Sequence, residues 1–189
     1  MDNKEKINKI YRYIFLGLSF IIIITAFFTS ATFKKSFTAS EGGVEESVSL
    51  DLKYNGWSFI LGEYVPELEF QENVNQSYVV QIKPSIMIII AYFLPFVASI
   101  VMMLLKKDNR ITGFVMTACF LFSAIMLFMT LNICSMNIQA INGYIPVEEG
   151  NASLSSIGFS MSYGPILGAL FACIGTIISF KFAMQKESE

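Results

Sequence analysis

Four glutamates within ten residues are the first candidates for chemistry: Glu63, Glu67, Glu69 and Glu72. Clustered carboxylates bind divalent cations, and two that lie close together can act as a general acid and a general base. The spacing of these four matches no EF-hand or other ordered carboxylate loop, which favours a solvated face over a cation site. Because no candidate nucleophile or histidine base accompanies them, the sequence predicts a protein that is not an enzyme.

Metal and cofactor sites lack their usual residues elsewhere in the chain. The sequence has no histidine and three cysteines, of which Cys119 and Cys173 lie within long apolar runs and Cys134 follows one. We interpret all three as small buried residues, so neither a zinc site nor a disulfide is expected. Since the chain also has no glycine-rich phosphate loop and no basic surface segment, we expect no cofactor and no nucleic-acid partner.

Three aromatic residues are the candidates for contact with a partner: Tyr54, Trp57 and Phe59. Trp57 is the only tryptophan, and it follows Asn55-Gly56, a dipeptide typical of hairpin turns. An exposed Trp often contributes most of the energy of a protein contact. Two structural roles stay open for Trp57, anchoring at a membrane interface and filling the core of a small sheet.

Four long apolar runs must position these residues. The chain is 54% apolar and 15% charged, well outside the usual balance of soluble domains. Each run has about 20 residues, the length that an α-helix needs to cross a bilayer. The predicted spans are 11–31, 85–105, 112–133 and 161–183. No charged residue lies in their central parts, which argues against a proton-coupled transporter or a voltage sensor.

The basic residues predict the orientation of the chain in the membrane. Nine of the thirteen Lys and Arg residues lie at 1–12, 106–110 and 181–186. The positive-inside rule therefore places both termini in the cytoplasm, and segments 32–83 and 134–160 outside the cell. The cytoplasmic segments are then the lead 1–10, the turn 106–111 and the tail 184–189. The first run also resembles a signal peptide, with Thr29-Ser30-Ala31 as a cleavage site, although its apolar core is long for one.

Residues 32–83 are expected to form a small extracellular antiparallel sheet. Segment 32–46 shows no periodicity and is interpreted as an irregular linker. Residues 47–54 then alternate apolar with polar, as a half-buried strand does, and Asn55-Gly56 favours a type I′ hairpin turn. The predicted strands are 47–54, 57–61, 67–71 and 77–83, with one more possible at 136–142. The predicted fold is therefore a membrane four-helix bundle that carries an outer sheet.

Two features of the spans concern packing. Pro95 lies within the second span, removes one backbone donor and predicts a kink. In the fourth span a row of small residues recurs every four positions: Gly164, Gly168, Ala172 and Thr176. Such a row lets another helix approach closely. That helix belongs either to the same bundle or to another membrane protein, including a second copy.

The pattern resembles the claudin-like four-transmembrane architecture. The resemblance covers nearly the whole chain by topology: four spans, cytoplasmic termini, and a first outer segment of strands that contains Gly56-Trp57. The cysteine pair that follows the Trp in that family has no counterpart here. The resemblance implies an outer sheet that mediates self-assembly or contact with other membrane proteins. Since Lys outnumbers Arg eleven to two, which is typical of AT-rich genomes, the chain is also similar to small four-span membrane proteins of Gram-positive bacteria.

These observations favour a non-enzymatic plasma-membrane protein that acts by contact or assembly. Its partners would be membrane lipid and either another copy or a different membrane protein. The alternative is a small transport component that handles an apolar or lipid-like solute, in a bundle rich in Phe and Met. A third interpretation, an immunity protein against a membrane-active peptide, is neither favoured nor excluded by the sequence.

Overall fold

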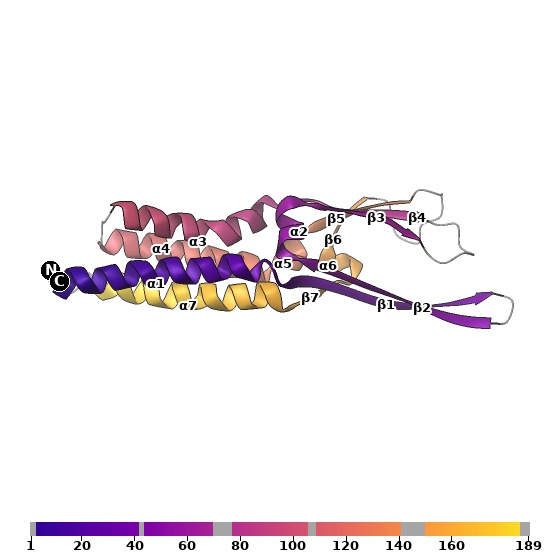
Figure 1. Ribbon diagram of the computed structural model, residues 1–189, viewed down its shortest axis with the longest axis horizontal. Coiled ribbons are helices and arrows are strands. Elements are labelled where there is room, and N and C mark those ends of the chain that lie inside the picture. The colour runs from indigo at the N-terminus through magenta and orange to yellow at the C-terminus, as the bar shows by residue number, and fades with distance from the viewer. Residues whose placement is uncertain (1–2, 42–43, 70–76, 106–108, 141–149, 186–189) are drawn as a thin grey trace.

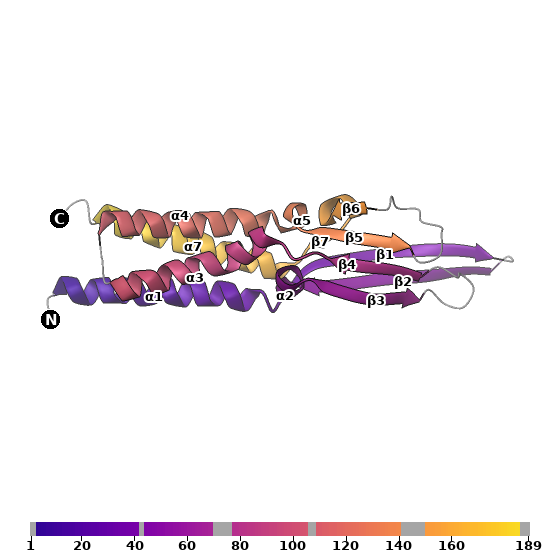
Figure 2. The ribbon, with the colours of Figure 1, turned by 90° about the horizontal axis from the view of Figure 1, so that it is seen from above.

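The computed structural model describes residues 3–41, 44–69, 77–105, 109–140 and 150–185. The described chain is elongated, with the long helices at one end and the strands at the other (Figures 1 and 2). We call the end of the helix bundle from which the strands leave the sheet end. The opposite end, where the first long helix begins and the last one finishes, is the terminal end.

Four helices are long and apolar enough to span a membrane, and each overlaps one of the four predicted spans. They are α1 (Asn3–Thr25), α3 (Ile86–Leu105), α4 (Arg110–Phe128) and α7 (Tyr163–Gln185). α1 and α4 each pack against both α3 and α7, so the four helices form a bundle. Large apolar side chains also cover its outside, as those of Leu104 and Ile177 do at 76% and 69% exposure. A bundle that is apolar on its outside is that of a multi-pass membrane protein.

Two helices end earlier than the apolar runs predict. α1 ends at Thr25 rather than at residue 31, because Ala26–Phe28 form a turn and Thr29 begins a strand. The third run, predicted to 133, breaks at Met129 and continues as the short helix α5 (Thr130–Ile133). Apolar composition does not mark these ends, since the residues beyond them are apolar as well.

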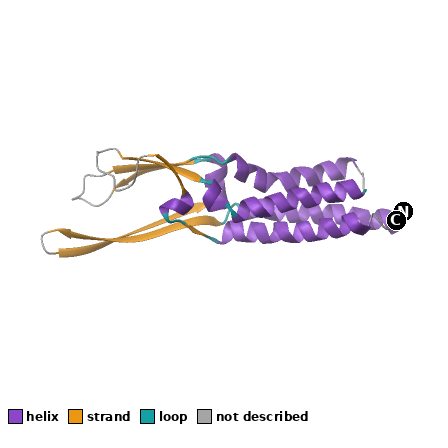
Figure 3. Cartoon of the chain, turned by 180° about the vertical axis from the view of Figure 1, so that it is seen from behind, coloured by secondary structure: helices purple, strands orange, loops and turns teal. Residues whose placement is uncertain are grey.

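The strands form two antiparallel sheets rather than one (Figure 3). Sheet A has the order β2-β1-β7 and sheet B the order β3-β4-β5-β6. Sheet A consists of β1 (Thr29–Glu41), β2 (Val44–Asn55) and β7 (Ser160–Met161). Sheet B consists of β3 (Glu63–Glu69), β4 (Ser77–Ile82), β5 (Ser135–Ala140) and β6 (Gly150–Ser153). Helix α2 (Gly56–Leu61) joins the two sheets, and α6 (Leu154–Ile157) lies between β6 and β7.

The first half of the outer segment differs from the prediction. Of segment 32–46, interpreted as a linker, residues 32–41 lie in β1 and residues 44–46 in the start of β2, and residues 42–43 lie outside the described chain. The strand at 47–54 exists, but it pairs with β1 through Phe33 and Leu52 among others. It does not pair with 57–61, which forms helix α2. The linker prediction failed because it overlooked an alternation of period two in β1: Ala31, Phe33, Phe37 and Ala39 are apolar, and only Lys35 interrupts this set.

The hairpin prediction at Asn55-Gly56 is wrong for a specific reason. Asn55 has φ −94° and ψ 175°, and its side chain accepts a hydrogen bond from the amide of Ser58 at 3.0 Å. Asn55 is therefore the N-cap of α2, a role for which Asn is as well suited as for a turn. A Cβ on Gly56 would lie 2.8 Å from the Cα of Ala26, so the glycine serves close packing against α1.

In sheet B the predictions hold more closely. The strand predicted at 67–71 is β3, which begins at Glu63 and ends at Glu69, and residues 70 and 71 lie outside the described chain. The strand predicted at 77–83 is β4, and the possible strand at 136–142 is β5.

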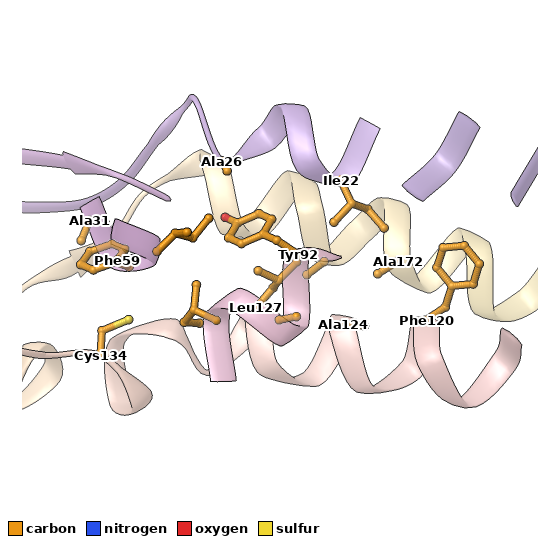
Figure 4. Packing of buried hydrophobic residues seen from close by; sticks show 14 of the residues in the cluster. Ile22, Ala26, Ala31, Phe59, Tyr92, Phe120, Ala124, Leu127, Cys134 and Ala172 are labelled. Atoms are coloured by element: carbon orange, nitrogen blue, oxygen red, sulfur yellow. The ribbon is translucent and has the colours of Figure 1, made fainter. Parts of the chain in front are cut away.

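One hydrophobic core runs from the bundle into the sheet end (Figure 4). Ile22, Tyr92 and Phe120 belong to its helical part, and Phe59 and Cys134 to its sheet end.

Candidate functional site

Helix α2 lies across the sheet end of the bundle and connects it to both sheets. Its N-cap Asn55 accepts hydrogen bonds from both the amide and the hydroxyl of Ser58. The amide of Gly56 donates to the carbonyl of Ala26 at 2.8 Å, and the amide of Ser85 donates to the carbonyl of Phe59, also at 2.8 Å. α2 is thereby bonded through its backbone to the end of α1 and to the start of α3. The bases of both sheets are consequently fixed to the bundle.

Tyr92 is the central side chain of this junction. It projects from α3 and is fully buried, and its ring points toward Ala26 (Figure 4). Its hydroxyl interacts with the side chains of Thr25 and Ser30. Because Thr25 ends α1 and Ser30 lies at the start of β1, Tyr92 joins two helices to sheet A. Sequence reasoning overlooked Tyr92, although a tyrosine near the end of an apolar run signals a buried hydroxyl that needs partners.

The three predicted partner-contact residues do not form one exposed patch. Phe59 is fully buried, and Tyr54 is 4% exposed. Trp57 is half-buried, with the rings of Phe27 and Phe93 at 5.3 and 6.2 Å. The structure therefore places Tyr54 and Phe59 in the core, which corrects their assignment as contact residues. Trp57 packs between α1 and α3.

Two of these residues carry a buried polar atom with no hydrogen-bond partner among the described residues: Tyr54 Oη and Trp57 Nε1. The Tyr54 ring lies 5.9 Å from that of Phe159. Burial, and secondarily the negative charge of Glu63, raises the pKa of Tyr54 to about 12. The hydroxyl of Tyr54 therefore stays neutral at physiological pH.

The small-residue row of α7 packs inside the bundle. A Cβ on Gly164 would lie 2.9 Å from the carbonyl oxygen of Thr29, and one on Gly168 would lie 2.7 Å from Thr25 Oγ1. Ala172 is fully buried. Thr176 is half-buried, and its hydroxyl donates to the carbonyl of Ala172 at 2.9 Å. Since the connection from α1 to β1 occupies the face at Gly164 and α1 occupies the face at Gly168, that part of the row offers no surface to a second protein.

Two further glycines that sequence reasoning overlooked bring α7 against α4. A Cβ on Gly113 would lie 2.8 Å from the Cα of Ala183. A Cβ on Gly175 would lie within 2.5 to 2.7 Å of ring atoms of Phe120. The hydroxyl of Thr117 donates to Ser179 Oγ at 3.0 Å in the same seam. The α4–α7 seam is therefore closely packed over this length.

Pro95 has a partner that the sequence did not reveal. As a proline it cannot donate to the carbonyl of Ala91, four residues earlier in α3. Ser123 of α4 is fully buried, and its hydroxyl donates to that carbonyl at 2.6 Å. A neighbouring helix thus satisfies the acceptor that the proline leaves without a backbone donor, as membrane helices require. The kink predicted at Pro95 stays a prediction.

The four glutamates give no support to a cation site. Glu63 begins β3 and is exposed, Glu67 and Glu69 lie in the same strand, and Glu72 lies outside the described residues. Among the described residues, no group of three or more His, Cys, Asp or Glu side chains gathers closely enough to hold a metal ion.

The longest feature beyond the bundle is the β1–β2 ribbon, residues 29–41 and 44–55. Its base is anchored, because β7 pairs with β1 at Ala31 and Thr32, and the ring of Phe159 lies 5.1 Å from that of Phe33. The pairing of β1 with β2 continues from there to Glu41 and Val44. The ribbon projects roughly along the long axis of the molecule, away from the bundle (Figures 1 and 2).

Comparison with protein-family models, with curated proteins and with solved structures gave no match. The geometry of the bundle, the junction and the ribbon is therefore the basis for assigning a function. These define an anchored ribbon on a closely packed membrane bundle.

Proposed function

We propose that this chain is a non-enzymatic plasma-membrane protein that acts by contact with another protein through its sheets. The observation that carries the proposal is the β1–β2 ribbon. Its strand β2 has twelve residues, whereas β7, the strand that anchors sheet A to the bundle, has two. Anchoring alone therefore does not account for the length of β2. An element of this length that projects from a rigid scaffold is a typical position for binding residues.

The orientation is part of the proposal. The sheets lie outside the cell and the terminal end lies in the cytoplasm, because the basic residues concentrate at the terminal end. In a bacterial cell membrane, which the composition favours, a partner would then meet the ribbon from the outer side. The claudin-like mode of action, in which an outer sheet mediates assembly, belongs to this proposal as an analogy of architecture.

The packing of the bundle supports contact through the sheets rather than through the helices. The glycines of α7 approach parts of the same chain closely: the α1–β1 connection at Gly164, α1 at Gly168 and α4 at Gly175. The lateral contact that we predicted for the α7 small-residue row is therefore not part of the proposal. The junction around Tyr92 fixes the ribbon base, which lowers the entropy lost when a partner binds.

Photocrosslinking in living cells tests the proposal. A photoreactive residue at Lys53, an exposed position in β2, is expected to give a discrete protein adduct. The matched control is Ile177, which is 69% exposed on α7 and is expected to give lipid adducts only. If photoreactive residues at Lys53 and at a second ribbon position, Ser49, both give lipid adducts only, as Ile177 does, or give no adduct, the proposed function is wrong.

The second candidate function is transport of an apolar or lipid-like solute. It needs a continuous cavity between the helices, and the direct α4–α7 contacts at Gly113 and Gly175 argue against one in that seam. Reconstitution in vesicles with a fluorescent lipid analogue distinguishes the two. Protein-dependent movement of the analogue between leaflets would favour transport.

A further inference from the structure

The edges of the two sheets differ in how well they are protected against pairing with another strand. In sheet B, the edge strand β3 contains Pro66 and a shift in register between Val65 and Leu68, and the other edge strand, β6, has only four residues. Prolines, irregularities and short lengths are the devices that prevent an edge from adding strands. Edge strand β2 has twelve residues and no proline, and the single register shift in its pairing with β1 lies at the ribbon base.

The ribbon is also incomplete as a sheet. Among the described residues β7 pairs with Ala31 and Thr32 alone, so the described part of sheet A has two strands from residue 33 outward along β1. A two-stranded antiparallel ribbon is marginally stable in water, whereas three strands are sufficient for independent stability. A third strand along the open edge of β2 would therefore stabilise the ribbon as well as bind to it.

The charge of the outer part of the ribbon indicates the charge that an added third strand would have. Between residues 36 and 50 the chain has three acidic residues, Glu41, Glu45 and Glu46, and no Lys or Arg. The lysines of the ribbon, at 34, 35 and 53, lie toward its base. Opposite charges at facing positions stabilise a strand pair and like charges destabilise it. The outer edge of β2 thus favours a cationic strand.

A second copy in the same membrane does not fit this edge. Because the ribbon runs along the long axis of the molecule, two copies in one membrane would bring their β2 strands together in parallel (Figure 2). Pairing in register would then place Glu45 and Glu46 next to the same residues of the other copy, and like charges at neighbouring positions repel. An antiparallel pair of β2 strands would require the second copy to lie in a facing membrane.

We propose that the open edge of β2 accepts, as an added strand, an extended Lys- or Arg-rich segment of a second, different polypeptide. This inference depends on the proposed function, for which it specifies the edge and the chemistry of the partner. Backbone hydrogen bonds along β2 supply the affinity, and Glu45 and Glu46 select the charge.

The test uses the full-length protein in zwitterionic nanodiscs and three synthetic ten-residue probes. The first probe alternates Lys with Val, the second alternates Glu with Val, and the third is the Lys-Val peptide N-methylated at consecutive residues. The third probe keeps the charge but cannot pair on either edge. We expect the Lys-Val probe to bind at least tenfold more tightly than either of the others, after subtraction of binding to empty nanodiscs.

Matched variants identify the edge. The double substitution Glu45→Lys and Glu46→Lys is expected to weaken binding of the Lys-Val probe at least tenfold. The same change in β3, Glu67→Lys with Glu69→Lys, should alter binding by less than twofold. Equal binding of the N-methylated and unmodified peptides, or equal effects of the two double variants, would overturn the inference.

Crosslinking in cells separates this inference from the proposed function. An adduct from Lys53 to another protein, together with no preference among the peptides, overturns only the inference that the partner adds a Lys- or Arg-rich strand. An adduct between two copies of the chain overturns the choice of a different polypeptide. Absence of any protein adduct from the ribbon overturns the proposed function itself.

Discussion

The hydrogen bond between Ser123 and the carbonyl of Ala91 should stabilise the bundle only because residue 95 is a proline. In Ser123→Ala the donor at 2.6 Å is lost, and the carbonyl of Ala91 then has no donor from residue 95 either. Hydrogen bonds between membrane helices contribute about 0.6 kcal/mol on average and up to about 1.7 kcal/mol. Since this acceptor has no alternative backbone donor, we expect a loss of about 1.5 kcal/mol, near the upper limit.

The substitution Pro95→Ala supplies the comparison. An alanine at 95 has an amide that donates to the carbonyl of Ala91 within α3, as in any α-helix. Removal of the Ser123 hydroxyl should then cost less than about 0.5 kcal/mol, because the carbonyl keeps a donor. The double-mutant cycle should therefore give a coupling energy of about 1 kcal/mol between positions 95 and 123.

Reversible unfolding in mixed micelles, titrated with a denaturing detergent, measures these free energies. Trp57 is the only tryptophan and packs against Phe27 and Phe93, so its fluorescence reports the sheet end of the bundle. Ser179→Ala is the matched control, since Ser179 donates to Gly175 in its own helix and should not couple to position 95. Additive effects of the changes at 95 and 123 would refute the reasoning.

Three other predictions concern stability. Gly113→Ala should lower the free energy of unfolding by about 1–3 kcal/mol, whereas Gly17→Ala, where a Cβ meets nothing within 4 Å, should be neutral or stabilising in the same detergent titration. The raised pKa of Tyr54, about 12 against 10 in the unfolded chain, favours the neutral hydroxyl, so the contribution of this group to stability should be full below pH 10 and decline between pH 10 and 12. Tyr54→Phe should make the decline between pH 10 and 12 smaller without loss at pH 7, and an unchanged decline would contradict the assignment. Asn55→Ala should cost about 1 kcal/mol through loss of the α2 cap, and an unchanged midpoint would contradict the capping role.

Sequence patterns predicted the helices better than the sheets, for a physical reason. A span is specified by its own composition, since each helix satisfies its backbone internally and needs only apolar side chains toward lipid. The partner of a strand is not specified by the strand. The alternation at 47–54 correctly indicated β2 but could not show that β1 lies beside it.

The Asn55-Gly56 dipeptide illustrates the same limit. The two residues suit a hairpin turn and a helix N-cap equally, and the decision depends on Ala26, about thirty residues away in sequence. Likewise the small residues of α7 indicated a close helix contact, but only the structure identifies α1 as the helix at Gly168 and the start of β1 as the neighbour of Gly164. The pairing of Pro95 with Ser123 has no sequence signal, because many serines lie in the spans and only one reaches the carbonyl of Ala91.

The account depends most on the ribbon lying outside the cell, where a partner can reach β2. Single cysteines at Lys53, in β2, and at Glu5, at the terminal end of α1, test this in a background without the native cysteines. Intact cells are treated with a membrane-impermeant maleimide before and after permeabilisation. The account predicts labelling of Lys53→Cys in intact cells and of Glu5→Cys only after permeabilisation. The reverse pattern would place the ribbon in the cytoplasm and contradict the account.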